Sequence, residues 1–395
     1  MSNIFLTNTK AVLKRELKRI TSRPIYLMAS VGVMLFCFIF FLTFFNEGMP
    51  RMLPIGVIDE DNSYISRTLT RNVDALPQVN VYKHYPNYEE ARKDMQRGKI
   101  YAFINIGKNF EADLFASRSP KIEYYVNETY LIAGSLAYKD LTYISELGSG
   151  YLQQRLMQAR GVVGDENIMP LIQPIAVDGH FIGNPYTNYG IYLLNLLLPG
   201  VLQLSILMLT VFVVGIEIKQ HTQGEWYDTS GHSISAAILG KILPYTFIFI
   251  LLGIVSNLLL YGYMHYTMNG RIWRMFLATI LYVISYQSIG VFIVGIFTRL
   301  RDAISLSAFY GLFAFTYAGF TFPIEAMPYK AQIFNYLFPI RYYFKIYVGE
   351  ALFGAPFNYS FIYFVAMSVF LLLSFLVIRR LKNELAKNTE VQQYA

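Results

Sequence analysis

Long apolar runs alternate with polar segments along the chain, and the apolar runs predict membrane-spanning helices. A helix needs roughly 20 apolar residues to cross a bilayer. The runs at 189–216 and 242–264 carry no Asp, Glu, Lys or Arg. Six spans are predicted in all, at 25–45, 189–216, 242–264, 275–298, 303–322 and 359–378. The fold class that follows is a polytopic α-helical membrane protein with six transmembrane helices.

Residues 1–24 precede the first span, and their pattern predicts an amphipathic helix on the membrane surface. Basic residues, among them Lys14, Arg15 and Arg19, alternate there with apolar residues such as Val12 and Ile20. A helix of this kind lies in the interface, with its apolar face in the lipid and its basic face near anionic headgroups. We therefore expect membrane lipids as partners of this segment.

Between the first two spans, residues 46–188 are polar and charged, and their pattern alternates between strand and helix. Helices are expected at 63–75 and 88–97, and strands at LPIGVID, VNVYKHY, IYAFINI and KIEYYVN. This alternation predicts an α/β domain. The run at 131–160 has helical spacing and predicts an arm, and the Gly- and Pro-containing segment 161–185 predicts a connector back to the membrane.

The basic residues decide the expected orientation, because Lys and Arg beside spans favour the cytoplasmic side. Nearly all fall on one side, whereas Arg271 and Arg274 fall on the other. Both termini, the tail at 379–395 and the loop 217–241 are therefore expected in the cytoplasm, and the domain 46–188 outside. The five-helix membrane domain covers 189–378. The basic residues that set this orientation, besides those of the N-terminal segment, are Lys219, Lys241, Arg299, Arg301, Arg379, Arg380 and Lys382.

A proline-broken segment, 319–350, is expected outside between the last two spans. Pro323, Pro328 and Pro339 divide it into pieces too short to span, and Glu325 lies between the first two of these prolines. The pieces are rich in Phe and Tyr, which favour the membrane interface. The segment is either an aromatic belt or a lid over an exit path.

Composition supports the membrane class and excludes others. The chain is 54% hydrophobic with a mean hydropathy of +0.37, which is too apolar for an ordinary soluble protein. The net charge of +7 comes from residues clustered beside the spans, so nucleic acid is not an expected partner. The single cysteine, Cys37, excludes a disulfide framework within one chain.

The sequence contains no recognisable catalytic or nucleotide-binding motif. The Gly-Lys pairs lack the remaining residues of a phosphate-binding loop, and GHSIS ends in serine where a nucleophile elbow needs glycine. The five histidines show no zinc-helix spacing. We therefore expect no catalytic residue, metal or cofactor on this chain.

The predicted spans contain no ionisable side chain, which disfavours a proton- or ion-coupled carrier. Energy then comes from elsewhere, or transport is passive or absent. The polar side chains available for a substrate path, with the proline between two of them, are Asn195, Pro199, Gln203, Asn257 and Gln287. The alternative is that these amides bond neighbouring helices.

The loop 217–241 is a polar island between two spans and therefore a candidate for energy input. Its charges, with the neighbouring hydroxyl of Thr222, are either solvated groups at a helix end or part of a partner-binding surface. Under the second interpretation Trp226 is an exposed aromatic anchor for a partner. The charged residues concerned are Glu217, Lys219, Glu225 and Asp228.

Several segments together resemble the type-2 ABC exporter permeases, in the multidrug-efflux-like branch. The outward domain carries IGVIDEDNSYISRTL and YEEARKDMQRGKIYAFINIGKNFEADL, and FPIEAMP followed by NYLFPIRYY precedes the last span. The loop carries Glu217, Thr222 and Glu225, and then Gly240-Lys241. His221 departs from the family pattern, which often has glycine before the threonine.

This resemblance implies six helices per subunit, dimerisation with a second or paralogous permease, and a separate ATP-binding subunit that carries ATP and Mg. It implies that the N-terminal helix and the loop after the second span couple the two proteins. A periplasmic adaptor is a further implied partner. The expected function is export of an amphiphilic or drug-like substrate across a bacterial inner membrane. The alternatives are a receptor or scaffold whose outer domain binds a ligand, and an ATP-independent channel or carrier.

Overall fold

The computed structural model describes residues 2–116, 118–159, 180, 182–185, 187–320 and 322–393. The chain forms two compact units, one of residues 1–46 with 181–395 and one of residues 47–180. Most of the connector predicted at 161–185 lies outside the described residues.

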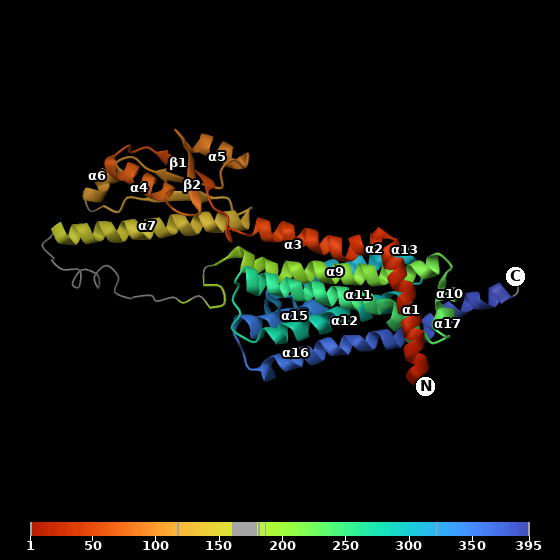
Figure 1. Ribbon diagram of the computed structural model, residues 1–395. Helices are drawn as coiled ribbons and strands as arrows, with labels where there is room; N and C mark the ends of the chain where they lie inside the picture. The colour runs from red at the N-terminus through yellow and green to blue at the C-terminus, as the bar shows by residue number, and fades with distance from the viewer. Residues whose placement is uncertain are drawn as a thin grey trace. The chain divides into compact units, whose positions relative to one another are not determined.

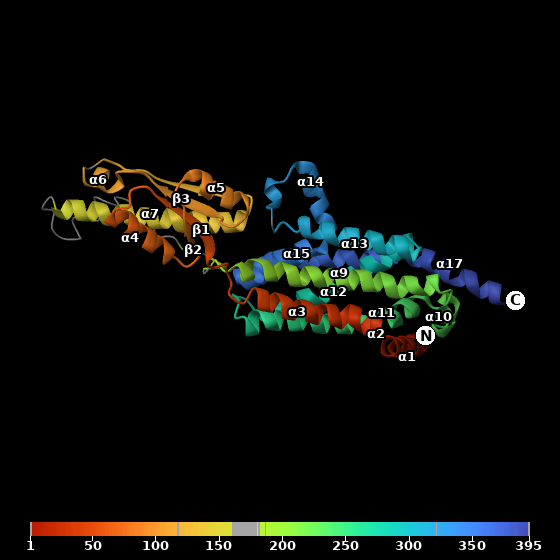
Figure 2. The same ribbon diagram turned by 90° about the horizontal axis from the view of Figure 1, so that it is seen from above.

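The first unit is a bundle of long helices, shown in Figures 1 and 2. Among the described residues, five continuous helical segments are long and apolar enough to cross a membrane: Pro24–Phe44, Tyr189–Lys219, Ile234–Tyr263, Ile272–Ile296 and Phe357–Ala386. The helices concerned are α2 (Pro24–Leu27), α3 (Val33–Phe44), α9 (Tyr189–Lys219), α11 (Ile234–Asn257), α12 (Ile272–Ile296), α16 (Phe357–Val369) and α17 (Leu373–Gln393), with π-helical segments at Met28–Gly32 and Leu258–Tyr263.

The fifth predicted span, 303–322, differs from the structure. Helix α13 runs over Leu300–Thr316, which is 17 residues or roughly 26 Å, shorter than the hydrocarbon core of a bilayer. It ends early because Gly319 takes a left-handed φ of +77° and Pro323 follows. The six-span count is therefore not confirmed.

Helices α9 and α12 form the centre of this unit and are buried along most of their length. Helix α13 packs closely on α9, because a Cβ atom on Gly200 would lie 2.0 Å from the ring of Phe315, and one on Gly311 would lie 2.3 Å from Leu204. The segments Pro24–Phe44 and Phe357–Ala386 are mostly exposed. Both chain ends lie at the same end of the bundle (Figure 1).

The second unit contains a four-stranded sheet with the order β2-β1-β3-β4. Strand β1 is parallel to β2 and β3, and β4 is antiparallel to β3. The strands are β1 (Leu53–Asp59), β2 (Val79–His84), β3 (Ala102–Ile106) and β4 (Ile122–Val126), and the helices are α4 (Tyr64–Asp74), α5 (Tyr88–Gln96), α6 (Phe110–Phe115) and α7 (Leu131–Ala159).

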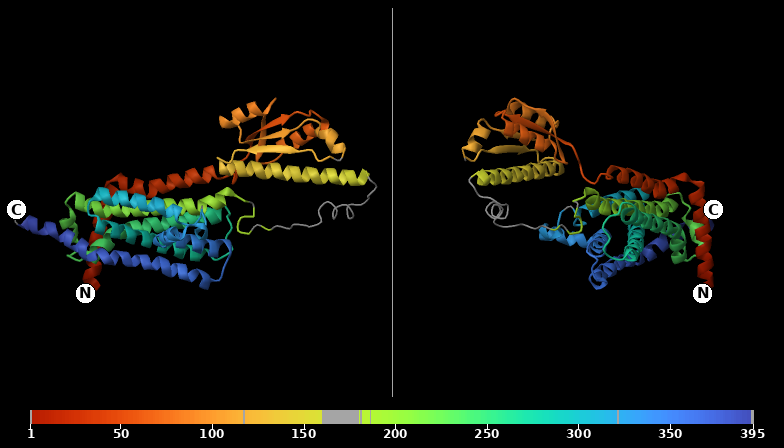
Figure 3. Two further views of the ribbon diagram at one scale, coloured as in Figure 1. Left: turned by 180° about the vertical axis from the view of Figure 1, so that it is seen from behind. Right: turned by 60° about the vertical axis from the view of Figure 1, so that its left-hand side comes forward.

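Helices cover both faces of this sheet, because alternate strand residues point to opposite sides. Ile104 packs with residues of α4, α6 and α7, whereas Phe103 packs with Ala91 of α5. Figure 3 shows α7 lying along its face of the sheet. Helix α4 begins at a capping box of Ser63 with Ser66, and α5 begins at Asn87, whose side chain accepts from the Glu90 amide.

Candidate functional site

A group of charged side chains is buried at the end of the helical unit that carries both termini. Helix α1 (Ser2–Ser22) crosses this end beside α11, as Figures 1 and 2 show. The two helices approach closely, because a Cβ atom on Gly240 would lie 2.7 Å from the Thr9 carbonyl oxygen and from Val12. Val12, Glu16 and Ile20, four residues apart, form the buried face of α1.

Lys241 is the central cation of this group and is fully buried. Its Nζ lies 2.7 Å from Glu16 Oε2 and 2.7 Å from Glu217 Oε1. It also lies 5.0 Å from the centre of the Trp226 ring, a cation–π distance. The Tyr245 hydroxyl donates to Glu16 Oε1 at 2.8 Å. Lys241 therefore joins α1, α9 and α11 through charge.

Glu217, at the end of α9, is the central anion and is also fully buried. Arg15 holds it with two hydrogen bonds, Nη1 to Oε1 at 2.7 Å and Nη2 to Oε2 at 3.2 Å. Arg19 donates to the same carboxylate, as does the Thr222 hydroxyl. Burial alone would lower the pKa of the Arg15 guanidinium, but the hydrogen bonds and charge of Glu217 raise that pKa above its ordinary value. Arg15 therefore stays charged.

We call these six residues, Arg15, Glu16, Arg19, Glu217, Thr222 and Lys241, the charge cluster. Its three cations outnumber its two anions, and Glu225 supplies a third carboxylate at the rim, 3.5 Å from Arg15 Nε. Buried ion pairs of this kind hold a fixed geometry, because separating one partner leaves an uncompensated charge. The cluster therefore ties α1 to the loop and to two long helices.

The prediction that Trp226 is an exposed anchor is wrong. The loop contains a short helix, α10 (Gln223–Thr229), which buries Trp226 and Tyr227 on its inner face. Trp226 is 1% exposed, and its indole Nε1 donates to the Ala237 carbonyl at 3.2 Å. Trp226 therefore packs α10 onto α11.

The interpretation of the loop charges as solvated groups fails for Glu217, which is buried. Lys219, Glu225 and Asp228 are exposed, and so is Lys14 on α1. These four side chains are the predicted coupling residues that face outward at this end of the bundle.

Sequence reasoning missed Glu16, and it used Lys241 for the orientation pattern and the family resemblance without assigning it a place in the site. A signal for Glu16 was present, because Val12 and Ile20 flank it at a spacing of four and place it on the apolar face of the helix. An acidic residue in the middle of an apolar face needs a buried cation. The sequence does not indicate that this cation is Lys241.

The five predicted path residues are buried and bonded between helices. Asn195 Oδ1 accepts from the Tyr261 hydroxyl at 3.1 Å, and Gln203 Nε2 donates to the Gly311 carbonyl at 3.1 Å. The remaining bonds run from Tyr282 to the Pro199 carbonyl at 2.8 Å, from Asn257 to Thr279 at 2.8 Å, and from Thr246 to Gln287 at 2.7 Å. In a single subunit these groups therefore serve as contacts between helices.

The proline-broken segment forms short helical pieces. Pro323 and Pro328 precede Ile324–Ala326 and α14 (Tyr329–Phe334), and Pro339 begins α15 (Pro339–Ile346). Glu325 is exposed. Helix α15 packs against α12 and α16, and a π-helical turn, Tyr347–Leu352, follows it.

This π-helical turn holds a second buried ion pair. Glu350 is fully buried, and its Oε2 lies 2.6 Å from Nη1 of Arg274 on α12. The guanidinium of Arg274 also lies 5.2 Å from the centre of the Phe357 ring. The pair therefore fixes the end of the proline-broken segment to α12.

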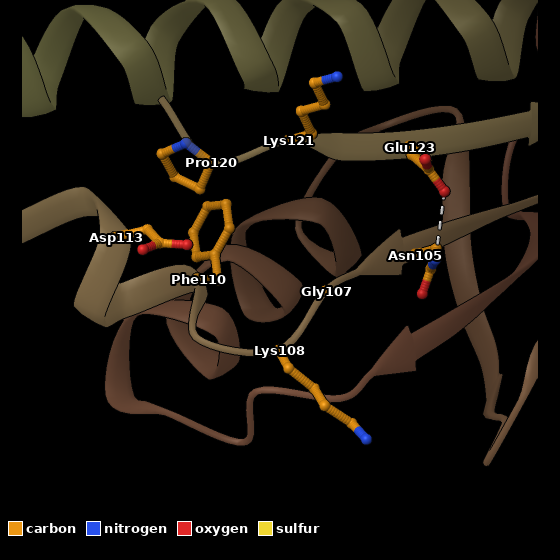
Figure 4. A pocket seen from close by; sticks show the side chains of 8 residues that line it. All are labelled: Asn105, Gly107, Lys108, Phe110, Asp113, Pro120, Lys121 and Glu123. Atoms are coloured by element: carbon orange, nitrogen blue, oxygen red, sulfur yellow. Dashed lines mark hydrogen bonds between the residues drawn. The ribbon is translucent and has the colours of Figure 1, made fainter. Parts of the chain in front are cut away.

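The second unit has a polar hollow of about 230 Å³ between α6 and the ends of β3 and β4, drawn in Figure 4. Asn105 Nδ2 donates to Glu123 Oε2 at 3.3 Å across the two strands. The side chains of Lys108 and Lys121 extend in opposite directions, away from the hollow. Because the two lysine side chains diverge, they do not converge on a single ligand in the hollow.

A family model described as ABC-2 family transporter protein matches residues 24–379. The match begins at the first span, so Arg15, Glu16 and Arg19 lie before it. A search of curated proteins found no match.

Proposed function

The chain belongs to the ABC-2 family of transporter proteins and is the membrane permease component of an ABC transporter, and from this premise we propose that it exports an amphiphilic or drug-like substrate. The family implies an ABC ATP-binding subunit as partner. In this proposal that subunit binds ATP and Mg and hydrolyses the nucleotide, and this chain carries no cofactor. The complex lies in a bacterial inner membrane with both termini of this chain in the cytoplasm.

The charge cluster is the observation that carries the coupling part of this proposal. In the long helices of the structure, the charged residues Glu217, Lys241 and Arg274 lie toward helix ends and are each held in ion pairs, so in this proposal the energy enters from the ATP-binding subunit. A partner that pushes on α10 or α1 also moves α9 and α11. The reason is that the ion pairs of Lys241 and Glu217 join α1, α9 and α11. The exposed side chains of Lys14, Lys219, Glu225 and Asp228 form the docking face.

The substrate path in this proposal opens when α9 shifts against its neighbours. Such a shift breaks the bonds of Asn195 to Tyr261 and of Gln203 to Gly311, and it frees both amides for a substrate. The substrate then leaves beneath the segment from Pro323 to Pro339, which acts as a lid over the exit. A second copy or a paralogue of this chain completes the path, membrane lipids surround the exposed helices, and a periplasmic adaptor contacts the outer domain.

ATP-dependent accumulation of a fluorescent amphiphilic dye in inside-out membrane vesicles tests the export proposal. The intact complex is expected to accumulate dye with ATP and to stop with vanadate. Asn195→Leu is expected to lower the rate several-fold while the complex still assembles, because leucine keeps the volume and removes the amide. A complex that hydrolyses ATP without vectorial dye movement in either vesicle orientation contradicts export of such cargo, and an unchanged rate in Asn195→Leu removes that residue from the path.

A further inference from the structure

A groove of about 790 Å³ lies in the second unit, among α4, α6, β4 and α7. This volume is within the range of small-molecule sites. Three helices and one strand build its walls, so its shape follows from the packing of the domain. Neither the family match nor the export proposal assigns it a role.

The lining of the groove is mainly apolar and aromatic. Ile65, Leu69 and Ile144 line it and also pack against the core of the domain. At the mouth, the side chains of Tyr64 and Phe115 are 71% and 69% exposed. Large aromatic side chains that stay in water beside an apolar hollow mark a surface that a ligand covers.

The charges at the groove favour a cation. Only two of its lining residues are charged, Glu111 and Arg118. Arg118 is already paired, with Nη1 3.2 Å from Asp113 Oδ1. The carboxylate of Glu111 makes no ion pair with any residue that the structure describes. The unpaired charge is therefore negative, and aromatic side chains, whose ring faces also attract cations, line the same groove.

Helix α7 leaves room for a bulky ligand on its side of the groove. Besides Ile144 and Tyr151, it contributes Ser145, Gly148 and Ser149, which are small residues. A Cβ atom on Gly148 would have no neighbour within 4 Å. The space opposite α4 and α6 is therefore open.

We propose that this groove binds lipophilic cations, meaning ligands whose positive charge is surrounded by aromatic or aliphatic groups. The apolar walls take up the hydrophobic groups, and Glu111 with the aromatic rings selects the positive charge. Describing such a ligand as cargo rests on the proposed export function, whereas the binding itself does not.

Binding of tetraphenylphosphonium to the full chain in nanodiscs tests the proposal, with tetraphenylborate as a control of similar shape and opposite charge. Empty nanodiscs give the partition of each ion into lipid, which is subtracted. Saturable binding of the cation, at least tenfold tighter than that of the anion, is expected. Glu111→Gln is expected to weaken the cation about fivefold, as for a partly exposed charge pair, and to leave the anion unchanged. Equal binding of both ions, or a cation affinity that Glu111→Gln leaves unchanged, overturns the proposal.

Two glycines of α7 offer a matched pair of variants. A Cβ atom on Gly148 or on Gly150 would meet no neighbour within 4 Å, but only Gly148 lines the groove. Gly148→Trp is expected to fill the groove and abolish binding, and Gly150→Trp to bind as the wild type does. If both variants lose cation binding, or if neither does, the ligand does not bind in this groove. Cation binding without ATP-driven transport would contradict the export proposal alone, and transport without this binding would contradict the groove alone.

Discussion

At the scale of single residues, His221 has a backbone conformation that is uncommon for a residue other than glycine. Its φ is +56°, in the left-handed region where glycine is favoured. The turn at this position joins the end of α9 to Thr222, whose hydroxyl bonds Glu217. The histidine therefore adopts a turn that glycine would adopt more easily, and this left-handed turn brings Thr222 back onto the charge cluster.

His221→Gly is expected to raise stability by up to about 1 kcal/mol, because a left-handed conformation costs a non-glycine residue roughly 1–2 kcal/mol and part of this gain is offset in the unfolded chain. The thermal unfolding midpoint in detergent measures this change. His221→Ala serves as the control, because alanine keeps the strain, and its midpoint should stay near that of the wild type. A fall in both variants would contradict this account of the turn.

Glu217→Gln is expected to destabilise the helical unit by about 3–5 kcal/mol, because it leaves Arg15, Arg19 and Lys241 without their shared carboxylate in a buried place. Glu225→Gln removes a carboxylate that is 71% exposed and should change stability by no more than about 0.5 kcal/mol. Thermal unfolding of both variants in the same detergent compares them. Equal midpoints would mean that the cluster does not hold this end of the bundle together.

At the scale of elements, the ion pair of Glu350 with Arg274 connects the π-helical turn after α15 to α12. Arg274→Met is expected to cost about 3–5 kcal/mol, because Glu350 is then buried without a counter-charge. The double variant Arg274→Met with Glu350→Leu should recover most of this loss, since no buried charge remains. A double-mutant cycle of thermal stabilities measures the coupling, and additive effects would show that the two side chains do not act as a pair.

The regular elements could largely be predicted from sequence. The strands β1 to β4 and the helices α4 and α5 lie where alternation and capping residues predict them, because these signals are local. The burial of Trp226 could not be predicted, because the seven residues of α10 are too few to reveal which face packs on α11. The charge cluster joins residues up to 225 positions apart, as in the pair of Lys241 and Glu16, and no local pattern records such a contact.

At the scale of the whole molecule, the family match and the charge cluster support the same account from different directions. The match covers residues 24–379 and implies an ATP-binding partner. The cluster lies at the end of the helical unit where α1, α10 and both termini meet. A force applied at that end reaches α9, one of the two central helices, through Glu217. In the proposed function, the transporter is then driven from one end of the bundle.

Purification from native membranes in mild detergent tests this central claim most directly, with mass spectrometry of bound proteins and an ATPase assay of the complex. An ABC ATP-binding subunit that stays bound and shows vanadate-sensitive hydrolysis is the expected result. Reversing the exposed charges with Glu225→Lys and Asp228→Lys should release that subunit, whereas the same change at Glu325 of the proline-broken segment should not. A chain that purifies alone, under conditions that keep comparable complexes intact, would contradict the account.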